Sequence, residues 1–118
     1  IVGTADSNIW RQQQEFAGIL ESVREGPLPY WAASSLPFGT AWNTAGNYGN
    51  YKSCSGWAQE QAGIRLATTI EIPYANVGTT IVTADKARAF GCDVARALRQ
   101  YLENGNRQTV SRTTNGSR

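Results

Sequence analysis

The sequence of 118 residues contains no histidine, no methionine and only two cysteines. Without histidine, the chain cannot build a Ser-His-Asp triad, a Cys-His pair or a zinc site that uses imidazole. Because methionine is absent even at position 1, we expect a chain that begins at Ile1 to be processed or to be a piece of a longer protein. Cys54 and Cys92 form no CxxC element and allow one disulfide or none; we expect two small buried residues rather than a metal site.

A strong charge of one sign and a long apolar run are also missing. Lysine and arginine number 11 against 9 acidic residues, a net charge of +2 that is too small for a nucleic-acid surface. No run approaches the roughly 18 apolar residues of a membrane span, and the first residues lack the basic and apolar regions of a signal peptide. We therefore expect one globular domain with no nucleic-acid partner and no membrane partner.

Two stretches have the three-and-four spacing of apolar residues that is typical of an amphipathic helix. The first predicts a helix over Asn8–Glu25, which Gly26-Pro27 ends, and the second predicts a helix over Ala84–Glu103, which Asn104-Gly105 ends. The expected buried residues of the first helix are Ile9, Phe16, Ile19, Leu20 and Val23. Those of the second helix are Ala87, Phe90, Val94, Leu98, Tyr101 and Leu102.

A strict alternation of side chains predicts a strand over Ile64–Ile72, which Pro73 ends. The stretch from Gly26 to Trp57 is rich in proline, glycine, asparagine and aromatic residues, which favours ordered loops and short strands. We therefore predict an α/β fold in which both helices pack on a sheet that includes Ile64–Ile72. We expect residues 1–105 to form the folded domain and residues 106–118 to form a polar, flexible tail.

Glu71 is the first candidate for chemistry, because it lies at the carboxyl end of the predicted strand, where ligands bind in open α/β sheets. A carboxylate between two isoleucines is costly to desolvate without a partner. It is therefore either a proton-transfer group or one half of an ion pair with Arg65 or another cation. Tyr48 and Tyr51 lie in a Gly/Asn-rich loop that could close over a substrate, or they are ordinary aromatic residues that cover the core.

Three motifs follow one another along the chain: Ser53-Cys54-Ser55-Gly56-Trp57-Ala58-Gln59-Glu60-Gln61, Gly63-Ile64, and Thr69-Ile70-Glu71-Ile72. Together they resemble the C-terminal part of the zinc carboxypeptidases related to the pancreatic digestive enzymes. The resemblance extends from about Tyr48 to Leu102, with one extra residue near Ala62, and is only topological over Ile1 to Asn47. It implies that the chain is part of a mixed-sheet α/β/α fold of the phosphorylase/hydrolase-like kind.

The resemblance also implies roles for four side chains. Glu71 corresponds to the general base and proton shuttle, and Tyr48, nine residues before Trp57, corresponds to the mobile tyrosine that closes over the substrate's terminal carboxylate. Tyr51 is an alternative for that tyrosine, because the repeat Gly-Asn-Tyr-Gly-Asn-Tyr allows a slip of three residues. Ser55 lies where the family sets its side-chain preference, and a serine at this position leaves the preference open.

The family holds zinc with a His-x-x-Glu motif and a later histidine, both upstream of the region that this chain resembles. The resemblance therefore implies the C-terminal portion of a zinc enzyme, inactive alone, whose partner is the missing N-terminal portion of the domain. In the complete enzyme, zinc and Glu71 would activate a water that hydrolyses the C-terminal bond of a peptide or cell-wall peptide. Many members of the family are secreted, which implies a periplasmic or extracellular location.

Two other functions stay open. A non-catalytic module of the same fold could bind a peptide or a protein partner through the exposed aromatic residues between Tyr30 and Trp57. A purely structural domain is the third alternative. A gene product much longer than this chain, with a His-x-x-Glu motif upstream, would favour the enzyme over the module.

Overall fold

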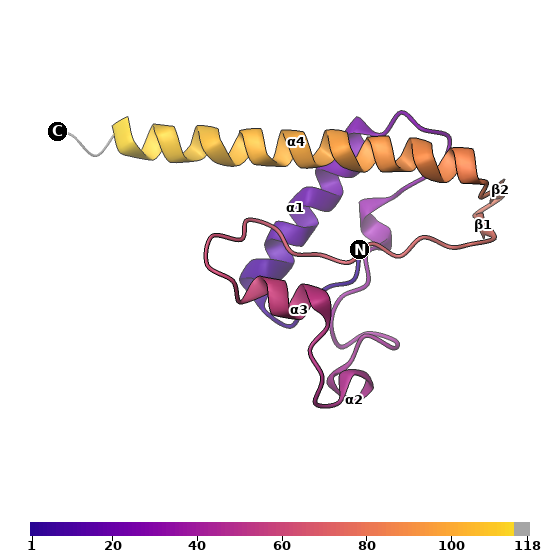
Figure 1. The fold of residues 1–118 in the computed structure, drawn as a ribbon, viewed down its shortest axis with the longest axis horizontal. Helices are drawn as coiled ribbons and strands as arrows, with labels where there is room; N and C mark the ends of the chain where they lie inside the picture. Colours follow the sequence, from indigo (N-terminus) through magenta and orange to yellow (C-terminus); the bar gives the residue numbers. More distant parts are fainter. Residues whose placement is uncertain (115–118) are drawn as a thin grey trace.

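A computed structural model describes the backbone of residues 1–114 and the side chains of residues 1–105 (Figure 1). The chain is a mixed α/β protein that is mostly helical, and the described residues contain one small antiparallel sheet of two strands. The α/β class is thus confirmed in its coarse sense, with much less strand than the sequence predicts. The elements are α1 (Ser7–Val23), the 3₁₀ helix η1 (Ala32–Ser34), α2 (Ala45–Tyr48), α3 (Cys54–Gln59), β1 (Asn76–Val77), β2 (Thr80–Ile81) and α4 (Ala84–Thr114).

The first predicted helix is confirmed as α1, with both of its ends shifted by one or two residues. The helix begins at Ser7 because the carboxylate of Asp6 accepts hydrogen bonds from the backbone N–H groups of Asn8 (2.8 Å) and Ile9 (3.0 Å). It ends at Val23 because the next residue adopts an extended conformation with ψ at 128°. The chain is therefore already turning away from the helix before it reaches the glycine-proline pair.

The hydrophobic core lies where α1 crosses α4 (Figure 1). The rings of Phe16 and Tyr101 meet edge to face, with centroids 6.1 Å apart and planes at 87°. The Tyr101 hydroxyl donates a hydrogen bond to the carbonyl oxygen of Arg65 (2.9 Å), which fixes the chain after α3 against α4. The buried core residues are Phe16, Ile19, Leu20, Leu28, Phe90, Ala97 and Tyr101.

Helix α4 differs from its prediction in the residues that it buries. Leu98 and Leu102 are exposed, because the oblique crossing with α1 covers only one narrow row of side chains on α4 (Figure 1). The buried row has the expected spacing of three and four residues and includes a carboxylate. Its members are Phe90, Asp93, Ala97 and Tyr101.

The predicted end of the second helix at Asn104-Gly105 is wrong, because α4 continues to Thr114. A glycine inside a helix costs about 1 kcal/mol relative to alanine, which weakens a helix without stopping it. The predicted polar tail, residues 106–118, therefore begins inside the backbone of α4. Its final residues, 115–118, lie outside the described residues.

The segment Ile64–Ile72 is not the strand that its alternation predicts. Within the described residues, this segment pairs with another stretch of backbone at one antiparallel β-bridge. In that bridge the N–H of Val2 donates to the carbonyl oxygen of Thr69 (3.0 Å). Alternation indicates which side chains share a face, but a strand also needs a neighbour to complete its hydrogen bonds. Leu66 and Ile70 do pack against the core. The predicted sheet beneath the two helices is absent from this part of the chain.

The two cysteines also differ from expectation. Cys54 and Cys92 are free and exposed, so the prediction of two buried residues is wrong. Cys54 begins the short surface helix α3, and Cys92 lies outside the narrow row that α4 buries. Of the helices described, none combines the length and the apolar character needed to cross a membrane.

Candidate functional site

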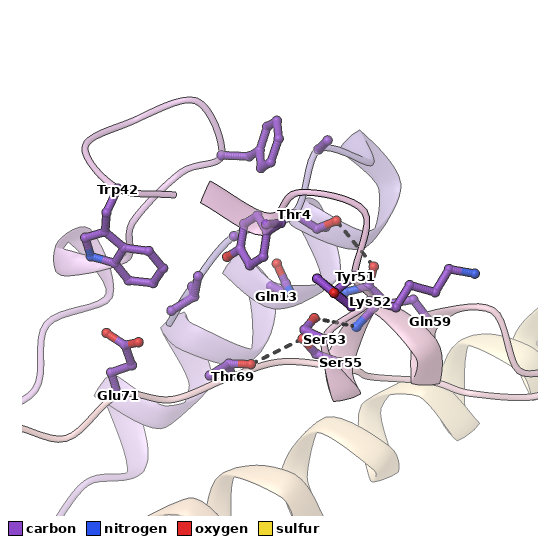
Figure 2. Close-up of a pocket in the computed structure, with 16 residues that line it drawn as sticks. Thr4, Gln13, Trp42, Tyr51, Lys52, Ser53, Ser55, Gln59, Thr69 and Glu71 are labelled. Atoms are coloured by element: carbon purple, nitrogen blue, oxygen red, sulfur yellow. Dashed lines mark hydrogen bonds between the residues drawn. The ribbon is translucent and has the colours of Figure 1, made fainter. Parts of the chain in front are cut away.

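A cleft of about 360 Å³ opens beside the first turns of α1 (Figure 2). Its volume is in the range of about 300–1,000 Å³ that is usual for small-ligand sites. The cleft is bounded by the chain before α1, by the loops on either side of α2, by α3 and by the segment around Thr69. These walls are mostly loops on a helical support, which is a common arrangement for binding residues.

A short stretch of backbone brings these loops together. The N–H of Gly3 donates to the carbonyl oxygen of Leu36 (2.8 Å), and the N–H of Leu36 donates to the carbonyl oxygen of Ile1 (2.8 Å). On its other side the same stretch forms the bridge between Val2 and Thr69. The loop that precedes α2 and the segment that carries Glu71 are therefore held on opposite sides of residues 1–3.

All four side chains that the sequence singled out line this one cleft. Glu71 comes from the segment after α3, Tyr48 ends α2, Tyr51 follows it, and Ser55 lies in the first turn of α3. Tyr48, Tyr51 and Ser55 are close in the sequence, so what the structure adds is Glu71, which lies 16 residues after Ser55.

Glu71 has no hydrogen bond and no salt bridge with any described residue. Its side chain is exposed, and in Figure 2 its carboxylate is turned toward the indole of Trp42 across the mouth of the cleft. Arg65, considered as a partner from the sequence, lies instead against Gly105 of α4. Arg65 is therefore not the partner of Glu71. Another cation interacts with it: burial lowers the pKa of the Ile1 ammonium, and the charge of the Glu71 carboxylate raises it. The Glu71 carboxylate is still exposed to a ligand.

The two candidate tyrosines are placed very differently. The Tyr48 hydroxyl donates to Oδ1 of the buried Asn43 (2.8 Å), whose Nδ2 donates to the carbonyl oxygens of Gly3 (2.9 Å) and Leu36 (3.2 Å). Tyr48 therefore faces the protein. Tyr51 is 89% exposed, and its hydroxyl bonds to no residue that the structure describes. In this conformation Tyr51 is the tyrosine whose hydroxyl can reach a ligand.

Three hydroxyl groups form a connected row on one wall. The Thr69 hydroxyl donates to Ser55 Oγ (3.2 Å), and Ser55 Oγ lies 3.2 Å from Ser53 Oγ (Figure 2). Ser53 is the N-cap of α3, because its Oγ accepts the N–H of Gly56 (3.1 Å). The cap holds the Ser53 side chain in place, so the row has a defined geometry.

Gln13 is a cleft residue that the sequence analysis missed. It is almost fully buried on α1, donates from Nε2 to the carbonyl oxygen of Ala67 (2.9 Å), and leaves Oε1 without a hydrogen-bond partner among the described residues. A buried acceptor without a partner costs about 1–3 kcal/mol. The signal was present, because position 13 follows Ile9 by four residues and precedes Phe16 by three, which puts a polar side chain on the apolar face.

The cleft does not have the ligand set of a zinc site. No group of three or more histidine, cysteine, aspartate or glutamate residues in the described part of the chain could hold a metal ion. The other polar groups that line the cleft with Glu71 are hydroxyls, amides and the ammonium of Lys52, which forms a salt bridge with Glu60 (2.6 Å). Zinc sites use thiolate, imidazole and carboxylate ligands, so these residues do not fit the metal.

Comparisons with known proteins give no relative from which a function could be transferred. No family model matches the chain, and neither a curated protein nor a solved structure matches it. The function of the cleft must therefore be inferred from its own geometry and from the sequence motifs.

Proposed function

We propose that this chain is the C-terminal portion of a metallocarboxypeptidase-like hydrolase whose cleft binds the C-terminal end of a peptide or cell-wall peptide. The observation that carries the proposal is that Glu71, Tyr48, Tyr51 and Ser55, chosen from the sequence and from its family resemblance, line the same cleft. On this proposal the chain is part of a mixed-sheet α/β/α domain, and the complete protein is secreted to the periplasm or the cell exterior.

Glu71 is the general base of the proposed reaction. Its carboxylate is exposed at the cleft and forms no hydrogen bond or salt bridge with a described residue, so it can accept a proton from the attacking water. The same carboxylate then returns the proton to the nitrogen of the departing amine. General acid–base catalysis of this kind contributes about 10²–10⁴-fold to a rate.

The other three residues bind the substrate in this proposal. Tyr51, with its free hydroxyl, and Tyr48, once released from Asn43, are the candidates for a hydrogen bond to the substrate's terminal carboxylate. Ser55 contacts the substrate side chain from the hydroxyl row. Trp42 on the opposite side of the mouth shields the reacting bond from water.

The partner of the chain, on the same proposal, is the N-terminal portion of the domain. A family enzyme holds zinc in that portion, and the described residues here do not fit the metal. The exposed hydrophobic side chains of Trp31 and Ile72 line one cavity and support a further covering element, because such groups seldom gather on a solvent surface. We therefore expect the chain alone to be inactive.

A non-catalytic peptide-binding module is the second candidate. Trp42, Tyr51 and Trp57 are all exposed, and the first two line the cleft. Aromatic side chains of this kind supply much of the binding energy at protein interfaces. A module would bind peptides in the same cleft without hydrolysing them.

The test is hydrolysis of N-blocked peptides with a free C-terminus by the intact, zinc-loaded protein that contains this chain. We expect Glu71→Gln to lower kcat by at least about 100-fold with little change in KM. The matched control is Asp85→Asn, which removes another exposed carboxylate, paired with Arg88 (2.6 Å) at the start of α4, and should leave kcat unchanged. Activity of Glu71→Gln within a few-fold of wild type would contradict the proposal, and peptide binding without hydrolysis by the wild type would favour the module.

A further inference from the structure

Gln13, which lines the cleft, has a buried amide oxygen that accepts no hydrogen bond from a described residue. Gln13 is 1% exposed, and its Nε2 donates to the carbonyl oxygen of Ala67 (2.9 Å). Because a carbonyl oxygen can only accept, this bond determines which end of the amide faces Ala67. Oε1 therefore faces away from Ala67, is buried, and has no hydrogen-bond partner among the described residues.

A second acceptor lies on the hydroxyl row. Thr69 donates its one hydroxyl proton to Ser55 Oγ (3.2 Å), so Thr69 Oγ1 can only accept further hydrogen bonds. Within the described part of the chain, nothing donates to it. Gln13 and Thr69 line the same cleft, and Figure 2 draws both among the side chains that surround it. The cleft thus offers two oxygen acceptors that still lack donors.

Ser55 supplies a donor beside these acceptors. Its Oγ accepts from Thr69, and its own proton can go either to Ser53 Oγ (3.2 Å away) or to a ligand. A group that satisfies all three positions carries two N–H donors and one acceptor. A carboxamide has this set, whereas an aliphatic side chain has none of it and an ammonium group lacks the acceptor.

The charge of this wall also favours a neutral ligand group. Gln13, Ser53, Ser55 and Thr69 are all uncharged, and the nearby Lys52 is already paired with Glu60 (2.6 Å). A cationic side chain placed against these four residues would lose its hydration, while the Glu71 carboxylate of the same cleft is turned away from them, toward Trp42 (Figure 2). An uncharged amide loses much less hydration free energy when it moves from water to this wall.

We propose that the cleft recognises the uncharged carboxamide side chain of glutamine or asparagine. The NH₂ group of this side chain donates to Gln13 Oε1 and Thr69 Oγ1, and its carbonyl oxygen accepts from Ser55. A donor reaches the buried Oε1 as the lining side chains change rotamer around the ligand, which is common on binding. The inference rests on the proposed function only in taking the ligand to be a peptide, and it adds the class of side chain that is preferred.

The experiment measures binding by calorimetry or NMR, so that it does not depend on hydrolysis. The intact protein is titrated with N-acetyl-Ala-Gln, N-acetyl-Ala-Leu and N-acetyl-Ala-Lys. We expect the glutamine peptide to bind about tenfold more tightly than the other two, as expected for one or two neutral hydrogen bonds. Gln13→Met and Thr69→Val should each remove most of this preference. Gln14→Met, the same substitution at an exposed neighbouring position of α1, should leave it intact.

Each outcome decides the proposal. Equal affinity for the three peptides, tighter binding of the lysine peptide, or a preference that persists in both variants would overturn it. Gln13→Met also removes the bond to Ala67, so Thr69→Val, at an exposed position, carries the test if the first variant fails to fold. A glutamine preference without hydrolysis would overturn the proposed reaction and support this inference. Hydrolysis without a preference for glutamine would support the proposed reaction and overturn this inference.

Discussion

The carboxylate of Asp93 on α4 accepts two hydrogen bonds from the backbone N–H of Gly26, at 3.1 Å to Oδ2 and 3.3 Å to Oδ1. The same carboxylate accepts the N–H of Glu25 (3.0 Å) and pairs with Arg96. Burial raises the pKa of Asp93, but the backbone N–H donors and the Arg96 guanidinium outweigh burial and hold the pKa below its ordinary value. The ionised Asp93 side chain therefore holds the loop after α1 against the middle of α4.

The close approach at this contact predicts that Gly26→Ala is destabilising. A Cβ at position 26 would lie 2.7 Å from Asp93 Oδ2 and 3.4 Å from the Cβ of Ala89. We expect the free energy of unfolding to fall by about 1–3 kcal/mol, as for other overpacked sites, measured by urea denaturation. The control is Gly18→Ala inside α1, where nothing lies within 4 Å and alanine should stabilise the helix by about 0.5–1 kcal/mol. Equal effects of the two substitutions would contradict the predicted clash.

The lowered pKa of Asp93 predicts a loss of stability in acid. Since this pKa is lower in the folded chain than in the unfolded chain, its contribution is complete above about pH 4 and is lost as the pH falls through the folded-state pKa. We expect Asp93→Asn to lower the free energy of unfolding at pH 7 by about 1.5–3 kcal/mol. The difference between variant and wild type should shrink at pH 3. A difference that stays constant across this range would show that the charge of Asp93 does not matter.

The contrasting placement of Tyr48 and Tyr51 predicts that their phenylalanine variants separate stability from binding. Tyr48→Phe removes the bond to the buried Asn43 and should lower the free energy of unfolding by about 1 kcal/mol. Tyr51→Phe removes an exposed hydroxyl and should leave unfolding unchanged while raising KM several-fold in the intact protein. If Tyr48→Phe instead raised KM without affecting stability, the substrate-binding tyrosine would be Tyr48.

The buried hydroxyl of Tyr101 predicts a loss of stability in alkali. Burial raises the pKa of Tyr101, and the Glu15 carboxylate adds to the rise, so the folded chain favours the protonated phenol. Its contribution is complete below the ordinary tyrosine value of about 10 and is lost as the pH rises through the folded-state pKa. Tyr101→Phe should cost about 1 kcal/mol at pH 8, by loss of the bond to Arg65, and should show a smaller alkaline loss by urea denaturation at pH 8 and pH 11.

Burial also raises the pKa of Tyr30, so part of the alkaline loss should remain in the Tyr101→Phe variant. A variant that lost stability in alkali as steeply as the wild type would contradict the role given to Tyr101.

Local patterns predicted the helices well and the sheet poorly. The spacing of Phe16, Ile19 and Leu20 predicts one face of a helix, because residues three and four apart in the sequence are always neighbours on a helix. The alternation of Ile64–Ile72 indicates only a preference for extended backbone, because the hydrogen bonds of a strand are made with residues far away in the sequence. In the described structure the neighbour is the single residue Val2. The burial of Leu98 and Leu102 was wrongly predicted because it depended on the angle at which α1 crosses α4.

The candidate site was also predictable from the sequence only in part. The sequence and its family resemblance proposed Glu71, Tyr48, Tyr51 and Ser55 as site residues, and all four line one cleft. Spacing could not show that the Tyr48 hydroxyl is taken up by Asn43, because that bond depends on how the loop before α2 folds. It also could not show that the Gln13 amide leaves one oxygen unbonded.

The crossing of α1 and α4 determines when this protein can fold during synthesis. The core joins residues 16–28 to residues 90–101, and every cleft loop lies between these two stretches or before the first of them. Until the ribosome has released the second stretch, α1 lacks its contact with α4, and a helix of 17 residues is marginal in water when it is isolated. The aromatic loops around Trp42 and Trp57 are therefore made before α4 can complete the core against which the domain folds. In this interval their exposed aromatic side chains make these loops prone to non-native contacts.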